Sequence, residues 1–217
     1  MVRYLATALA ISAAGPACAH PHVFIDTRVE VIFDKAGKAS QVRIAWTYDD
    51  FYSLSMLADQ GYDMDGDGKL TEDELYRLSG FDMHWQAGYP GDTYALFGDT
   101  PLKLGPPHDY TAEFTDGKLI STHLRDIEPA IDPVAKPLVV RSYDPSYYVE
   151  YTITDPPQVT GREGCKVALV EPDLTAADTQ LQEALSKYSA DMDVEVDYPA
   201  VGAAFADEVR VQCKDHS

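Results

Sequence analysis

A regular alternation of apolar and polar side chains is the feature that most restricts the fold of this chain. Such a two-residue period places successive side chains on opposite faces of a strand. From His22 to Phe33, one face carries Val23, Ile25, Val29, Val31 and Phe33, and the other carries His22, Asp26, Arg28 and Glu30. After a turn at residues 34–38 the alternation resumes at Val42, Ile44, Trp46 and Tyr48. These patterns predict an opening β-hairpin with one buried face.

Short strand-like segments occupy most of the remaining chain. They cover residues 93–97, 109–114, 118–127, 137–143, 147–153, 165–170 and 209–213. Turn signals such as Asp116-Gly117 separate them. We therefore expect an α+β fold that is mainly β, with antiparallel, β-sandwich-like sheets. One helix is expected in the C-terminal half, with an apolar face that should pack on a sheet. This face comprises Leu174, Ala177, Leu181, Leu185 and Tyr188.

The N-terminal segment has the organisation of a secretory signal peptide. Arg3 precedes an apolar stretch of about ten residues, and small residues at Ala17 and Ala19 mark a cleavage site. The alternative in which Cys18 carries a lipid lacks the usual aliphatic residue at the third position before the cysteine. We expect residues 1–19 to be the signal peptide and residues 20–217 to form a single β-rich domain in the periplasm.

The net charge limits the classes of partner. A formal charge of −19 repels nucleic acid backbones and anionic lipid heads. No stretch after the signal peptide approaches the roughly 18 apolar residues that a membrane-spanning helix needs, so the protein is not expected to be membrane-embedded. Cations are natural ligands of such a chain, although the charge also serves solubility.

Two cysteines, Cys165 and Cys213, remain after the signal peptide is removed. In an oxidising compartment, an even pair favours a disulfide over a thiolate metal site. On the chain-entropy account, this link stabilises the fold by about 4 kcal/mol.

An aspartate-rich segment from Asp63 to Glu74 matches the EF-hand calcium loop, in which hard oxygen atoms surround Ca²⁺. The predicted ligands are Asp63, Asp65, Asp67, the backbone carbonyl of Lys69, Thr71 through a water molecule, and both carboxylate oxygens of Glu74. Helical spacing on both sides predicts a helix-loop-helix insertion at about residues 49–88. Carboxylates gathered without an ion would repel one another, so we predict one structural Ca²⁺ here.

Part of this segment has a metal-free explanation. Thr71 and Glu74 also form a T-x-x-E capping box, which would start the second helix without an ion. Capping does not account for Asp63, Asp65 and Gly68, so calcium remains the prediction.

Cleavage of the signal peptide would expose His20-Pro21-His22 with a free amino group. The imidazoles and the amine become neutral donors around neutral pH, and His20, His22 and Asp26 share the polar face of the first strand. We predict a site for Zn²⁺, Ni²⁺, Co²⁺ or Cu²⁺. Pro21 has no amide proton, which excludes the square-planar motif that uses deprotonated backbone amides. The alternative is a pair of solvated histidines at a frayed terminus.

The remaining motifs carry little chemistry. His84, His108 and His123 stay open as ligands. The sequence contains no G-x-S-x-G elbow, no H-E-x-x-H helix and no glycine-rich phosphate loop. An enzyme is therefore not expected, and copper oxidation chemistry at an N-terminal histidine brace is the alternative.

Several ordered segments carry a resemblance to a known family. They are H-P-H-V-F-I-D from His20, W-T-Y-D from Trp46, D-M-D-G-D-G-K-L from Asp63, G-P-P-H-D-Y from Gly105, D-P-S-Y-Y from Asp144, and the two late cysteines. Together they resemble a bacterial family known as domain of unknown function 1007, often labelled the periplasmic component of an uncharacterised ABC-type transport system. The resemblance implies an accessory of nickel, cobalt or zinc transport. His108 stands where many relatives carry another residue.

Two functional hypotheses follow. In the first, a calcium-stabilised periplasmic protein exchanges a transition metal with a membrane metal transporter or ABC permease through His20, His22 and Asp26. In the second, a calcium-stabilised interaction module docks on a transporter or envelope protein and binds no transition metal.

Overall fold

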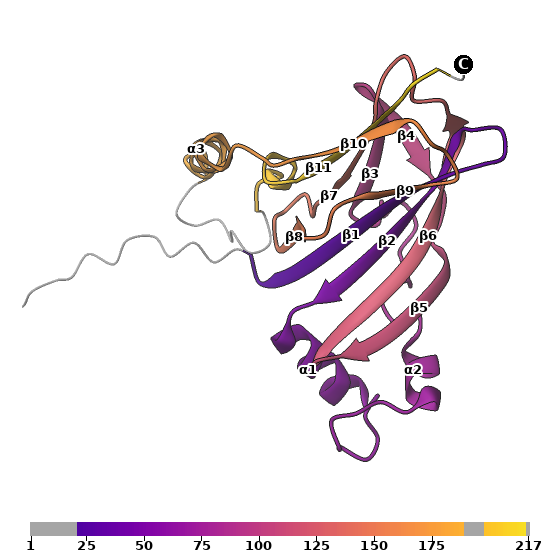
Figure 1. The fold of residues 1–217 in the computed structure, drawn as a ribbon. Helices are drawn as coiled ribbons and strands as arrows, with labels where there is room; N and C mark the ends of the chain where they lie inside the picture. Colours follow the sequence, from indigo (N-terminus) through magenta and orange to yellow (C-terminus); the bar gives the residue numbers. More distant parts are fainter. Residues whose placement is uncertain (1–20, 189–197, 216–217) are drawn as a thin grey trace, which may run out of the picture.

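Alternating side chains build a curled sheet of eleven strands in residues 21–188 and 198–215, the part of the chain that the computed structural model describes (Figure 1). The strands are β1 (Val23–Phe33), β2 (Ala39–Tyr48), β3 (Thr93–Phe97), β4 (Thr100–Leu104), β5 (His108–Thr115), β6 (Lys118–Ile131), β7 (Leu138–Ser142), β8 (Val149–Ile153), β9 (Gln158–Thr160), β10 (Cys165–Val170) and β11 (Glu208–Cys213). The prediction of a mainly β fold is confirmed. Strands β4 and β9, both short, were not predicted.

The strand pairing corrects the expected sandwich. The order is β10-β11-β7-β3-β4-β6-β2-β1-β8, with β5 added to β6 and β9 added to β1. Most pairs are antiparallel, but β1 pairs in parallel with β8 and β9. The long strand β6 pairs with β4 at one end and with β2 along its body, so it joins two sets of strands into one curled mixed sheet. Alternation shows which face of a strand is buried, but it does not show which strands are neighbours.

The opening hairpin buries the face that the alternation predicted. Val29 of β1 lies opposite Ile44 of β2, and Val31 lies opposite Val42. Val31, Val42 and Ile44 are fully buried, whereas Asp26 and Arg28 on the other face are exposed. The inner face of this hairpin therefore forms part of the core.

Two helices follow β2, in the region where helical spacing was predicted. They are α1 (Asp50–Gln60) and α2 (Glu72–Leu78). Asp49 caps α1, because its carboxylate accepts a hydrogen bond from the Tyr52 amide, and the same side chain accepts one from the Phe24 amide of β1. The cap thus fixes the start of α1 against the first strand.

The two helices lie at one end of the sheet (Figure 1), where two serines bond them to it. The hydroxyl of Ser53 in α1, which is fully buried, accepts a hydrogen bond of 2.9 Å from the Leu119 amide of β6. The hydroxyl of Ser79, just after α2, donates to the carbonyl of Tyr110 in β5 at 3.1 Å. The loop between α1 and α2 is therefore held away from the core by two anchored helices.

The third helix, α3 (Leu174–Leu185), has the predicted apolar face only in part. Ala177 and Leu181 are buried, but Leu174 is 58% exposed. The backbone of α3 comes close to the short 3₁₀ helix η1 (Gly202–Ala204). Both helical segments lie beside the sheet edge that contains β10 and β11 (Figure 1).

The predicted disulfide is confirmed between Cys165 and Cys213. The two cysteines are direct partners across the antiparallel pair of β10 and β11. The link therefore closes the edge of the sheet and ties the C-terminal strand to its neighbour.

Candidate metal centre

The loop between α1 and α2 brings three predicted calcium ligands together. Carboxylate oxygens of Asp63, Asp65 and Asp67 all lie within 4.8 Å of one another. Within residues 21–188 and 198–215, no other group of three or more histidine, cysteine or acidic side chains comes this close. The geometry thus selects the same three aspartates as the sequence pattern.

Hydrogen bonds from the backbone hold these carboxylates. Asp63 accepts from the amides of Gly66 and Gly68 at 2.9 and 3.0 Å, and Asp67 accepts from the Lys69 amide at 2.8 Å. Both glycines have positive φ, +69° and +74°, a conformation that L side chains resist. The loop is therefore shaped by its own short-range contacts, and hard carboxylate oxygens of this kind suit Ca²⁺.

Glu74 does not join the three aspartates in this structure. One of its carboxylate oxygens accepts a hydrogen bond from the Met64 amide at 3.0 Å, and the other accepts from the amide and hydroxyl of Thr71 at 2.8 and 2.7 Å. These donors lower the pKa of Glu74 to about 2, the backbone amide of Met64 contributing most. Thr71 and Glu74 thus form the capping box of α2, so Glu74 would have to release Thr71 to bind an ion with both oxygens.

The predicted N-terminal site is only partly within the described residues. His20 lies outside them. His22 stacks on Tyr148 with ring centroids 4.7 Å apart, and its amide donates to the carbonyl of Tyr148 at 2.9 Å. Asp26 is exposed on β1, four residues further along the chain. Because an extended chain rises by about 3.3 Å per residue, the Cα atoms of His22 and Asp26 are separated by about 13 Å, which is too far for one ion.

The three histidines left open by the sequence have different surroundings. His84 is exposed. His108 is partly exposed, with its ring nitrogens 3.0 Å from Asp109 and 3.5 Å from Asp126. His123 is fully buried on β6, packed edge-on against Trp46 and Trp85.

Sequence reasoning missed a set of buried polar side chains inside the curled sheet. The buried Tyr48 hydroxyl donates to Asp82 at 2.6 Å. Asp92, which is 4% exposed, accepts hydrogen bonds from the hydroxyls of Tyr89 and Tyr151 at 2.6 and 2.9 Å. Burial raises the pKa of Asp92 to about 6 despite these donors. The contacts of Tyr48 with Asp82 and of Tyr151 with Asp92 join residues 34 and 59 positions apart, so no local spacing could reveal them.

His123 and Arg125 occupy the same inner face of β6. Burial, and then the charge of Arg125, lower the pKa of His123 to about 3. Neither ring nitrogen of His123 meets a hydrogen-bond partner among the described residues. Arg125 is 4% exposed and donates to the carbonyls of Pro90, Leu104 and Gly105 while it stacks over Trp85. Burial also lowers the pKa of Arg125, to about 10.

Comparisons with known proteins address the identity of the chain. No helix in the described ranges is long and apolar enough to cross a bilayer. A search of curated proteins found no match. The model of the family described as "protein of unknown function (DUF1007)" matches residues 5–213. This range includes β1 to β11, the acidic loop and both cysteines of the disulfide. This chain therefore belongs to the DUF1007 family.

Proposed function

We propose that this protein is an exported, calcium-binding accessory of a transition-metal transport system, with one Ca²⁺ in an EF-hand between α1 and α2. The convergence of Asp63, Asp65 and Asp67 within 4.8 Å carries the calcium part of the proposal. Three carboxylates at this separation repel one another, and a divalent cation removes that repulsion. In this proposal the segment also supplies the backbone carbonyl of Lys69 and, through a water molecule, the hydroxyl of Thr71.

Calcium would act as a structural ion. The loop leads from α1, which is bonded to β6 through Ser53, to α2, which is bonded to β5 through Ser79. An ion held by ligands from both ends of this loop would fix the two helices relative to the sheet. The expected dissociation constant is about 10⁻⁴ to 10⁻³ M, as in extracellular modules.

Calorimetric titration with calcium chloride tests this part. We expect Asp63→Asn to weaken calcium binding by at least about tenfold, because it removes one of four ligand carboxylates. Asp59→Asn is the matched control, since Asp59 is an exposed aspartate at the end of α1 and the change in net charge is the same. Calcium binding that is absent at millimolar concentration, or equal in the two variants, would refute the site.

The transition-metal part of the proposal rests on the N-terminal histidines. His22 is anchored beside Tyr148 at the start of β1, so it offers a fixed imidazole near the chain terminus that signal cleavage would create. In this proposal His20 and His22 coordinate Zn²⁺, Ni²⁺, Co²⁺ or Cu²⁺ reversibly, and a membrane metal transporter or ABC permease supplies or receives the ion. Asp26 is left out because of its distance along the strand.

The terminus can be tested without changing any side chain. The mature protein beginning at His20 is compared with a form that has one extra N-terminal residue, and bound zinc, nickel, cobalt and copper are measured in both. We expect the native terminus to retain metal and the extended form to lose it. His84→Asn, at an exposed histidine, is the control and should leave the metal content unchanged. Equal and negligible metal in both forms would refute coordination by the terminus.

A second candidate function is docking on a transporter or envelope protein. The observation that favours it is a set of exposed apolar side chains on α1, α2 and the loop between them. These are Phe51, Leu54, Met64 and Tyr76, which are 59–84% exposed. Exposed acidic residues such as Asp50 and Glu72 belong to the same two helices, so the matching partner surface is apolar with basic residues. Site-specific photocrosslinking in cells should link position 51 to a membrane transporter, but not position 169, an exposed leucine on β10. Identical crosslinks from both positions would argue against docking.

A further inference from the structure

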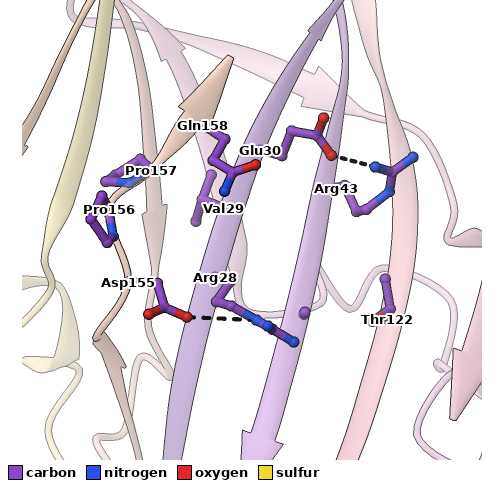
Figure 2. A pocket seen from close by; sticks show the side chains of 10 residues that line it. Arg28, Val29, Glu30, Arg43, Thr122, Asp155, Pro156, Pro157 and Gln158 are labelled. Atoms are coloured by element: carbon purple, nitrogen blue, oxygen red, sulfur yellow. Dashed lines mark hydrogen bonds and ion pairs between the residues drawn. The ribbon is translucent and has the colours of Figure 1, made fainter. Parts of the chain in front are cut away.

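The outer face of the sheet carries a groove where the neighbours of β1 change. Pairing between β1 and β8 ends at Thr27 and Ile153, and pairing between β1 and β9 resumes at Glu30 and Gln158. Residues 154–157 pass over this gap and include two consecutive prolines, Pro156 and Pro157. Together with outward-facing residues of β1, β2 and β6, they enclose a volume of about 550 Å³ (Figure 2).

Strand register explains why this groove has a floor. Arg28 of β1 lies opposite Ala45 of β2, which in turn lies opposite Thr122 of β6. On the next rung, Arg43 of β2 lies opposite Glu30. The small side chains of Ala45 and Thr122 leave space between the two arginines, whose Cα atoms are diagonal neighbours at about 7–8 Å. Two guanidinium groups thus border a shallow apolar floor.

The two arginines differ in how firmly they are held. Arg43 forms an ion pair with Glu30, which is only 16% exposed. Arg28 lies 3.9 Å from Asp155, and both side chains are more than half exposed. An exposed ion pair at this distance contributes little and exchanges readily with other acceptors. Arg28 can therefore offer its planar fork to another carboxylate, whereas Arg43 stays with Glu30 (Figure 2).

We propose that this groove binds a small organic monocarboxylate. Its carboxylate pairs with Arg28 in place of Asp155, and its carbon skeleton lies against Pro156, Pro157 and Ala45. The two arginines and two acidic residues of the lining cancel, and the whole chain carries a charge of −19. Because Arg43 stays paired with Glu30, only Arg28 is available to an anion, and this single positive charge suits one carboxylate better than a polyanion. The site is independent of the calcium loop and of the N-terminal histidines.

A titration followed by ¹H–¹⁵N NMR tests the proposal, with benzoate, acetate and inorganic phosphate as probes on the calcium-containing protein. We expect benzoate to shift the amides of residues 28, 45 and 155–158, with a dissociation constant on the order of 1 mM. Acetate should bind more weakly because it lacks a carbon skeleton to cover the prolines. Phosphate that binds more tightly than benzoate at these residues would overturn the assignment, as would the absence of any shift at roughly 20 mM benzoate.

Variants of the Arg28–Asp155 pair give a readout that misfolding cannot imitate. Arg28→Gln should weaken benzoate binding at least about tenfold, and Arg28→Lys should weaken it less, because a lysine keeps the charge without the fork. Asp155→Asn should tighten binding, because it removes the competing carboxylate. Arg210→Gln is the control, since Arg210 is 50% exposed and pairs with Glu208 within β11, outside the groove. Equal affinity for benzoate in wild type, Arg28→Gln and Asp155→Asn would mean that the groove is an ordinary solvated surface.

Discussion

The acidic loop and the interior of the curled sheet both gather polar side chains, but they do so in opposite ways. In the loop, Asp63, Asp65 and Asp67 lie within five consecutive residues, and two of them are exposed. In the interior, Asp92 lies just before β3, His123 and Arg125 lie on β6, and all three are at most 4% exposed. The first group needs only a local turn to form, whereas the second needs the whole sheet.

This difference has an energetic consequence. Exposed carboxylates remain solvated, so each contributes little to the free energy of unfolding when no ion is bound. Buried polar groups have given up water, and their stability depends on each partner being in place. We therefore expect changes in the interior to alter stability strongly and changes in the loop to alter it weakly.

Loss of Arg125 should have the largest effect. Arg125→Ala removes a charged donor to the carbonyls of Pro90, Leu104 and Gly105 and leaves them buried without it. We expect a loss of about 3–5 kcal/mol in the free energy of unfolding, measured by urea denaturation. Arg210→Ala, at a half-exposed arginine, should stay within about 0.5 kcal/mol. If both variants lost equally little free energy of unfolding, the interior would not be the region whose polar groups matter more for stability.

His123 should make the interior sensitive to acid. Its folded pKa of about 3 lies below the unfolded value, so the unfolded chain binds more protons and stability falls as the pH drops from about 6.5 towards 3. Between pH 6.5 and pH 4 this contribution is about 3 kcal/mol. Unfolding measured across this range should show a shallower pH dependence for His123→Leu than for wild type. Parallel curves for the two proteins would contradict the assigned burial.

The contribution of Asp92 to the pH dependence of stability should have the opposite sign and be smaller. Its folded pKa of about 6 lies above the unfolded value, so its contribution to stability is present at low pH and is lost as the pH rises through about 6. Asp92→Asn keeps the acceptor for Tyr89 and Tyr151 and suits the positive φ of 45° at this position. Relative to wild type, we expect the free energy of unfolding of Asp92→Asn to rise by about 1.5 kcal/mol between pH 4 and pH 5.5. A gain that does not change with pH would point to a cause other than ionisation.

The smallest effect is expected at the capping box in the loop. Thr71→Ala removes the hydroxyl that caps α2 and should cost about 1 kcal/mol with or without calcium. Thermal unfolding in the presence of calcium and of a chelator would measure both values. A loss seen only with calcium would mean that Thr71 serves the ion and not the helix.

The same contrast explains how much could be predicted. Period-two alternation located most strands, and the hairpin of β1 and β2 has the predicted inner face, because side-chain direction in a strand depends only on its own backbone. The disulfide followed from having two cysteines in a chain that the N-terminal segment predicts to be exported. The sandwich was wrong because β6 pairs with β4 as well as β2, and no pattern within β6 specifies its neighbours.

The sequence by itself determined the acidic loop, since all its candidate ligands lie within one twelve-residue segment whose glycines dictate the turn. It also determined which faces of the strands are buried. Only the tertiary structure decided that Arg28 faces a proline-walled groove beside Asp155, and that the buried Asp92 accepts a hydrogen bond from Tyr151. These contacts join residues distant in the chain, and their energies depend on burial, which exists only once the sheet has curled around them.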